Sequence, residues 1–213
     1  MIQLAPLGDS AVLITLGTTI NRDVSRRVLA LAAALRNERL RGVTDVVPAY
    51  ISLAVHYDPV VVEESELTAR LRELASAPLA APERAEQRLV VIPVTYDGPD
   101  LPSVANARGI TVADVVARHS SVEYFVYLLG FTPGFAYLGD LDPALHMPRR
   151  ESPRSRVPAG AVAIAGSQTA VYPHDTPGGW HLIGTTAVAM FDPAREQPSL
   201  LRAGDRVKFE VVA

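Results

Sequence analysis

Four arginines fall within eight residues of this 213-residue sequence: Arg149, Arg150, Arg154 and Arg156. Guanidinium groups form bidentate hydrogen bonds to carboxylates and phosphates. Prolines at positions 148, 153 and 158 stiffen the segment, so the guanidinium groups can be held ready for an anion. The same pattern is also typical of a solvated loop whose arginines pair with nearby acids, and such surface pairs contribute little to stability.

The sequence Thr-Pro-Gly-Gly-Trp at residues 176–180 is a second candidate for anion binding. Gly178 and Gly179 leave consecutive backbone N–H groups open, and such amides can form an anion-binding nest. A hairpin turn followed by a core tryptophan fits the pattern equally well. Gln168 is a neutral donor and acceptor that could hold a substrate amide or carboxylate, or could make a strand-end hydrogen bond to backbone.

Two histidines are candidates for general acid–base catalysis, His119 before an expected strand and His181 directly after Trp180. A histidine beside a tryptophan is more often a packing residue with one satisfied nitrogen. No spacing of His, Asp and Glu resembles a metal site, and there are no cysteines, so we expect no bound metal.

Large aromatic rings stand among turn residues between positions 130 and 184, a region with eight of the fourteen glycines and seven of the seventeen prolines. A small barrel cannot easily bury so many rings, and aromatic residues and arginine are enriched at binding hot spots. We therefore expect an interface or a site lining here, with packing inside the barrel wall as the alternative. The residues concerned are Phe131, Pro133, Phe135, Tyr137 and Trp180.

Composition excludes several classes of function. The net charge is −3, without a basic patch for nucleic acid, and no apolar run approaches the ~18 residues of a membrane span. The first residues lack the features of a signal peptide, so we expect a cytoplasmic protein. The sequence has no P-loop, Rossmann fingerprint or nucleophile elbow, and hence no complete ATP site. A shaped surface without complete catalytic machinery indicates one subunit of a larger enzyme.

The first half is predicted to be a small α+β domain over residues 1–80. Residues 11–16 alternate as a strand, Asn21 can cap a helix, and residues 44–57 are extended with a bend at Pro48. Asp58 and Pro59 resemble an N-cap followed by the first residue of a second helix. The proline-rich residues 76–87 have no periodicity and mark the expected boundary.

The second domain, residues 86–213, is predicted to be mainly β. Thr111 and Asp114 form an expected capping box at the start of a short helix. Short apolar runs separated by turns favour a closed or nearly closed barrel. The expected strands lie at 89–94, 124–129, 161–165, 187–191 and 207–211.

The ordered motifs GF-x-PGF-x-YL, PRR-x-SPR-x-x-VPAG, IAG-x-Q and YP-x-x-TPGGW-x-LIG, within residues 124–186, resemble one family closely. It is the family of bacterial 5-oxoprolinase B subunits, also called allophanate hydrolase subunit 1, whose module also occurs in the carboxyltransferase region of urea carboxylases as subdomains C and D. The resemblance implies a cyclophilin-like barrel in the second domain. It also favours Arg149 and Arg154 as the residues that bind an anion or dock a partner.

The resemblance further implies a subunit, inactive alone, of an ATP-dependent hydrolase that opens 5-oxoproline to glutamate. The related allophanate hydrolase or carboxyl-transfer activity also uses a small amide-like substrate, and the motifs do not separate the two. The implied partner is a second carboxyltransferase-like subunit, with a third in some assemblies, and ATP is used by the complex. Some family members resemble inhibitors of sporulation histidine kinases, so a regulatory role is the alternative. One departure is Thr185, where the family commonly has arginine.

Overall fold

The computed structural model describes residues 2–78 and 88–212. The chain divides into two compact units, Met1–Gln87 and Arg88–Ala213, and each is described by itself. Most of the expected boundary segment, residues 79–87, lies outside the described residues. No described helix is long and apolar enough to cross a membrane.

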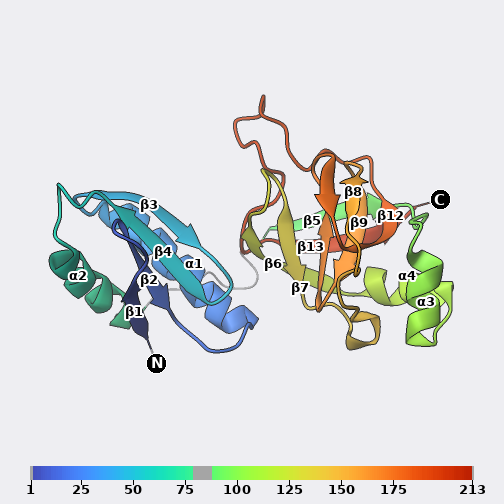
Figure 1. The fold of residues 1–213 in the computed structure, drawn as a ribbon, viewed down its shortest axis with the longest axis horizontal. Helices are drawn as coiled ribbons and strands as arrows, with labels where there is room; N and C mark the ends of the chain where they lie inside the picture. The colour runs from blue at the N-terminus through green and yellow to red at the C-terminus, as the bar shows by residue number, and fades with distance from the viewer. Residues whose placement is uncertain (1, 79–87, 213) are drawn as a thin grey trace. The chain divides into compact units, whose positions relative to one another are not determined.

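The first unit is a four-stranded antiparallel sheet with two helices (Figure 1). The strand order is β1-β2-β4-β3, and the core lies between the sheet and the helices. The elements in chain order are β1 (Gln3–Pro6), β2 (Ala11–Thr15), α1 (Arg22–Glu38), β3 (Val43–Pro48), β4 (Ser52–Tyr57) and α2 (Glu64–Ser76).

Local signals placed most of these elements correctly. Helix α1 follows Asn21, whose side chain accepts a hydrogen bond from the Val24 N–H at 2.9 Å, as the capping pattern predicts. The extended stretch 44–57 is a hairpin of β3 and β4 rather than one bent strand. The helix start predicted at Asp58 is wrong, because the Asp58 carboxylate accepts from the Val60 N–H in a local turn and α2 begins at Glu64.

The second unit is a seven-stranded sheet in the order β12-β9-β10-β7-β6-β13-β5, with a separate two-stranded sheet of β8 and β11. Its strands are β5 (Leu89–Val94), β6 (Glu123–Leu129), β7 (Ala136–Gly139), β8 (Arg154–Val157), β9 (Ala161–Ala165), β10 (Gln168–Val171), β11 (Thr176–Gly178), β12 (His181–Thr185) and β13 (Arg206–Val211). Pairing is antiparallel except between β13 and β5.

The two edges of this sheet meet, which makes it a nearly closed barrel. Thr95, just after β5, exchanges two backbone hydrogen bonds with Thr185 at the end of β12, at 2.9 and 2.8 Å. Gly184 fits this junction because a Cβ there would lie 2.6 Å from the Thr95 carbonyl oxygen. The Thr185 hydroxyl donates to the Asp97 carboxylate at 2.9 Å.

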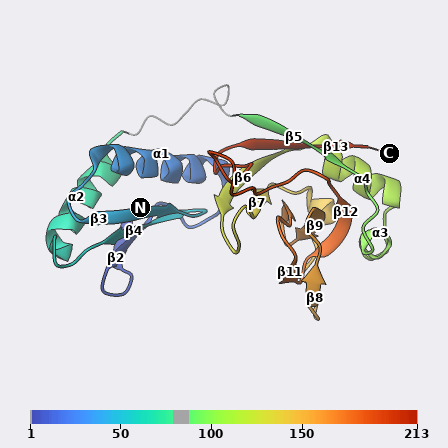
Figure 2. The same cartoon turned by 90° about the horizontal axis from the view of Figure 1, so that it is seen from above.

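Two helices pack together at one end of the barrel sheet, α3 (Leu101–Arg108) and α4 (Val112–Ser121) (Figure 2). The capping box predicted for α4 is confirmed, since the side chains of Thr111 and Asp114 each accept from the other residue's backbone N–H. Helix α3 was missed because its short sequence has almost no amphipathic pattern. The strand expected at 187–191 is wrong, since only Phe191 makes an isolated bridge, to Ser199.

Barrel closure makes a prediction about glycine. Gly184→Ala should lower the free energy of unfolding by about 1–3 kcal/mol, because the new methyl group overlaps backbone atoms that cannot rotate away. Gly179→Ala is the matched control, since its Cβ would meet ordinary contacts at 3.7 Å. Urea unfolding of both variants measures the difference. Equal stabilities would show that the junction adapts to a side chain.

Candidate functional site

An aromatic pocket of about 120 Å³ brings together much of the predicted site. Its lining comes from the β6–β7 loop, from β7, from the arginine-rich segment, and from β11 and the chain on either side of it. The residues lining this aromatic pocket are Phe131, Phe135, Tyr137, Arg149, Tyr172, Pro177, Gly178, Gly179 and Trp180.

The rings of the pocket form a packed cluster around Phe135. Its ring meets those of Tyr172, Tyr137 and Trp180 edge to face, with centroids 5.3, 5.0 and 5.8 Å apart. Phe135 and Trp180 are buried within the unit, so these two rings line the pocket from inside and do not form a free interface. Phe131, by contrast, is 64% exposed and Tyr137 is half-buried, so the four rings are not all buried.

The two glycines expected to form an anion nest are placed differently. Residues 176–178 form strand β11, in which Gly178 pairs with Arg154, and do not form a hairpin turn. A Cβ at Gly178 would lie 2.3 Å from the Tyr172 hydroxyl, so glycine is needed there for close packing. The Gly179 carbonyl accepts from the Arg150 N–H at 2.8 Å. Both glycines still line the aromatic pocket.

Tyr172 keeps its proton at neutral pH. Burial raises the pKa of its phenol, and this outweighs the opposing effects of a hydrogen bond from the Trp180 backbone N–H and the nearby charge of Arg149. Tyr172 therefore contributes an uncharged side chain to the lining of the aromatic pocket, and Arg149 is the one arginine among the lining residues.

Three of the four clustered arginines are paired with acids. Arg150 and Arg154 both donate to the same oxygen of Asp100, at 3.0 and 2.8 Å, and Arg156 donates to Asp175 at 2.8 Å. Arg149 is exposed and makes no ion pair with the described residues, although it lines the aromatic pocket. The anion-binding prediction thus applies best to Arg149, while Arg154 is engaged with Asp100.

Asp100 is the important residue that the sequence did not reveal. It precedes α3 and is 4% exposed, and its second oxygen accepts from the Leu182 N–H at 2.7 Å. Burial acts to raise its pKa, but the hydrogen bonds from Arg154 and Leu182 and the charges of both arginines hold the pKa below its usual range. The only local signal was an aspartate at a possible helix start, which predicts a cap and not an ion pair.

His119 lies fully buried in the core and does not line the aromatic pocket. Its Nδ1 lies 2.7 Å from the Tyr96 hydroxyl, and its Nε2 lies 2.8 Å from the Thr169 hydroxyl. Because Thr169 donates its own proton to the Ala163 carbonyl at 3.0 Å, Nε2 must carry the hydrogen. Burial lowers the pKa of His119 to about 3, so the ring stays neutral with both nitrogens occupied.

The other predicted residues lie outside the aromatic pocket. His181 donates from Nε2 to the Pro148 carbonyl at 2.9 Å, and its Nδ1 is buried without a partner among the described residues. Gln168 begins β10, opposite Gly139 of β7. Pro133 lines a separate open hollow of about 400 Å³, which shares Phe131 with the aromatic pocket.

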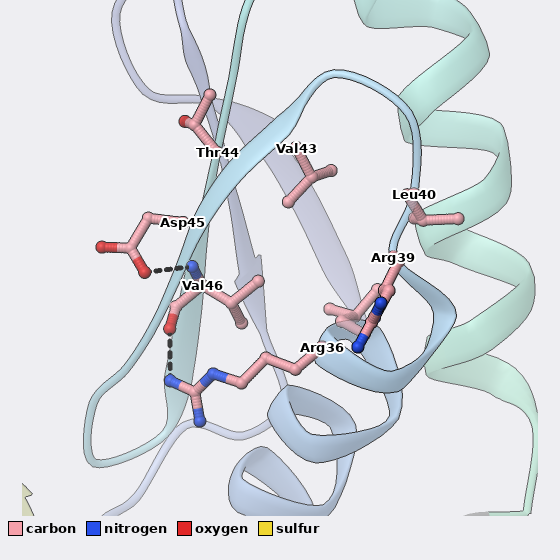
Figure 3. Close-up of a pocket in the computed structure, with 8 residues that line it drawn as sticks. Arg36, Arg39, Leu40, Val43, Thr44, Asp45 and Val46 are labelled. Atoms are coloured by element: carbon pink, nitrogen blue, oxygen red, sulfur yellow. Dashed lines mark hydrogen bonds between the residues drawn. The ribbon is translucent and has the colours of Figure 1, made fainter.

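The first unit has a hollow of its own, about 290 Å³, between α1 and β3 (Figure 3). Arg36 reaches across it and donates to the Val46 carbonyl at 2.7 Å, and Asp45 accepts from the Val46 N–H at 2.7 Å. None of the predicted site residues lies there. Within residues 2–78 and 88–212, no group of three or more His, Asp or Glu side chains could hold a metal ion.

Comparison with known proteins places the chain in a family. Residues 2–201 match the family described as carboxyltransferase domain, subdomain C and D, and the chain belongs to that family. It is 43% identical over 219 residues to the B subunit of 5-oxoprolinase from Bacillus subtilis (strain 168), covering 97% of this chain and 91% of that protein. Identity to the B subunit of 5-oxoprolinase from Escherichia coli O157:H7 is 43% over 218 residues, covering 95% and 93%. The resemblance seen in the motifs is confirmed.

Solved structures agree in fold. The crystal structure of TTHA0988 superposes with a TM-score of 0.85 at 44% identity, covering 100% of this chain but only 40% of that longer chain. The Kluyveromyces lactis urea carboxylase gives a TM-score of 0.77 at 19% identity, covering 100% of this chain and 22% of that one. The second likeness concerns the fold alone.

The buried histidine predicts a pH dependence of stability. Above pH ~6.5, His119 is neutral whether the chain is folded or unfolded. As the pH falls from ~6.5 toward 3, His119 binds a proton in the unfolded chain but stays neutral in the folded chain. The free energy of unfolding therefore falls by up to about 1.4 kcal/mol per pH unit. His119→Gln removes this pH-dependent loss of stability. Urea unfolding between pH 7 and 4 should show that the difference in free energy of unfolding between wild type and variant becomes smaller as the pH falls. A constant difference would contradict the assignment of His119 as a buried, neutral residue.

The Asp100 pairs predict a structural role for Arg154. Arg154→Met should lower the free energy of unfolding by about 1.5–3 kcal/mol, because a buried carboxylate loses a charged hydrogen bond. Arg156→Met is the control, since its pair with Asp175 is largely exposed and is worth about 0–1 kcal/mol. Thermal and urea melts of the two variants provide the comparison. Equal small losses would leave Arg154 free for a ligand.

Proposed function

We propose that this chain is the substrate-binding subunit of an ATP-dependent 5-oxoprolinase, which converts 5-oxoproline, ATP and water to glutamate, ADP and phosphate. The relatives that match nearly the whole chain are named as B subunits of 5-oxoprolinase, which favours this enzyme over a kinase regulator. The observation that carries the proposal is Arg149, unpaired among the described residues and lining the aromatic pocket.

The chemistry of 5-oxoproline matches this pocket. The molecule is a flat five-membered lactam that bears one carboxylate. Arginine binds a carboxylate through two parallel hydrogen bonds, and aromatic walls cover an apolar ring while excluding water. Phe135 and Trp180 supply such walls, and Arg149 supplies the cation. In this proposal Arg149 fixes the carboxylate and thereby orients the lactam bond toward the mouth of the pocket.

The catalytic step needs more than this pocket holds. An amide is a poor electrophile, and transfer of a phosphoryl group from ATP to the lactam oxygen would activate the ring carbon toward water. Addition of water and cleavage of the C–N bond would then give an acyl phosphate, which a second water would hydrolyse to glutamate and phosphate. About 120 Å³ is too small for ATP, because sites for larger ligands occupy roughly 300–1,000 Å³. The sole lysine, Lys208, is already engaged with the Ser121 carbonyl at 2.7 Å. In this proposal the groups that transfer the phosphoryl group do not come from this chain.

A partner subunit would complete the enzyme. The relatives are each named as one subunit of 5-oxoprolinase, which implies that those proteins work with other subunits. TTHA0988 is a longer chain in which the matched region is 40%, which leaves room for a fused companion. We propose a second carboxyltransferase-like subunit, and in some assemblies a third, as the source of the ATP-handling groups. Allophanate or another small amide is the alternative substrate for the same pocket.

The proposal predicts a separation of activity from stability at Arg149. In the reconstituted complex, Arg149→Gln should raise KM for 5-oxoproline by about ten- to a hundredfold, the effect of losing a charge-assisted hydrogen bond. The melting temperature should stay close to wild type because Arg149 has no partner among the described residues. Steady-state kinetics of 5-oxoproline-dependent ATP hydrolysis and a thermal melt measure the two effects.

Two controls make the Arg149 experiment decisive. Arg156→Gln removes a neighbouring arginine that lies outside the aromatic pocket, and it should leave KM unchanged. The isolated chain should show no 5-oxoproline-dependent ATP hydrolysis. Wild-type KM in Arg149→Gln would reject the substrate role of this arginine, and turnover by the chain alone would reject the need for a partner.

A further inference from the structure

Phe131 has an unusual backbone conformation for a large side chain. Its φ is +72°, in the left-handed region that bulky residues rarely adopt. Among the described non-glycine residues only Arg39 also has a positive φ, and it follows the last turn of α1, where such residues are common. Phe131 caps no helix. Strain of this kind persists only where the surroundings enforce it, and it is concentrated at ligand-binding and active sites.

The loop between β6 and β7 enforces this conformation. The Gly130 N–H donates to the Phe135 carbonyl at 3.1 Å, and the Phe135 N–H donates to the Thr132 carbonyl at 3.0 Å. These two bonds close the loop on both sides of Phe131. A glycine at position 131 would adopt the same φ without strain, as Gly134 does in the same loop with φ +81°.

The ring of Phe131 gains little from its own unit. It is 64% exposed, and its ring contact is an edge-to-face pair with Phe135, with centroids 5.4 Å apart. It lines the aromatic pocket on one side and the open hollow on the other. A strained backbone and an uncovered aromatic ring are both unfavourable in the free protein, and a ligand lying against the ring would offset both.

We propose that Phe131 is a substrate-contacting residue whose ring covers one face of the small lactam held by Arg149. This rests on the proposed function and adds to it the group that closes the pocket against water. The ring face suits a flat, uncharged amide, and its position beside Arg149 in the pocket lining lets one ligand reach both groups. In this arrangement the left-handed backbone sets the direction of the ring before the substrate arrives, so little ordering is needed on binding.

The test compares Phe131→Gly, Phe131→Ala and Phe131→Tyr in the full chain. Trp180 is the only tryptophan and lines the aromatic pocket, so its fluorescence reports occupancy by added 5-oxoproline. Phe131→Gly should weaken Kd about tenfold or more, yet melt a few degrees higher than Phe131→Ala because only glycine relieves the strain. Phe131→Tyr keeps the ring and should keep Kd within about twofold.

The outcomes separate this inference from the proposed function. If wild type binds 5-oxoproline and Phe131→Gly binds it equally well, the substrate contact is rejected while the pocket and Arg149 stand. If Phe131→Gly melts below Phe131→Ala, the backbone at this position is not strained by a side chain, and the inference is also rejected. If wild type gives no saturable fluorescence change, the pocket does not bind this substrate, and both proposals fall.

Discussion

The buried carboxylate of Asp100 organises the region around the candidate site. One oxygen accepts hydrogen bonds from the guanidinium groups of Arg150 and Arg154, and the other accepts one from the backbone N–H of Leu182. A buried carboxylate without partners would be strongly unfavourable, so the arginine-rich segment must stay against β12. This attachment holds the segment that carries Arg149 beside Trp180, and the wall of the aromatic pocket depends on it.

The same interaction explains why neighbouring arginines have different roles. An arginine paired with a buried acid is held in place by that acid, whereas an arginine without such a partner keeps its charge available for a ligand. Arg150 and Arg154 belong to the first kind and Arg149 to the second. Paired arginines that position an unpaired one give a site that is both rigid and cationic, as carboxylate binding requires.

The sequence predicted local features well and long-range contacts poorly. The caps at Asn21 and Thr111 were correct because a cap depends on a few adjacent residues. The aromatic pocket could be anticipated from the density of rings, glycines and arginines within residues 130–184. The partners of Asp100 could not, because they lie 50 to 82 residues away along the chain. The burial of His119 could not be predicted either, since nothing near it in the sequence indicates burial.

Small residues around the aromatic cluster explain the pocket itself. The rings of Phe135, Tyr172 and Trp180 share a core cluster with four alanines of β9 and β10: Ala161, Ala163, Ala165 and Ala170. Gly178 is a further small residue beside these rings, since the Tyr172 hydroxyl occupies the space where a Cβ of residue 178 would lie. These alanines alternate along β9 and β10 with the residues of the main barrel core, so the rings pack on the other face of the sheet, where large rings fit only if the facing positions are small. The rings are therefore held at fixed positions, and the aromatic pocket is the space that remains on the side of Arg149.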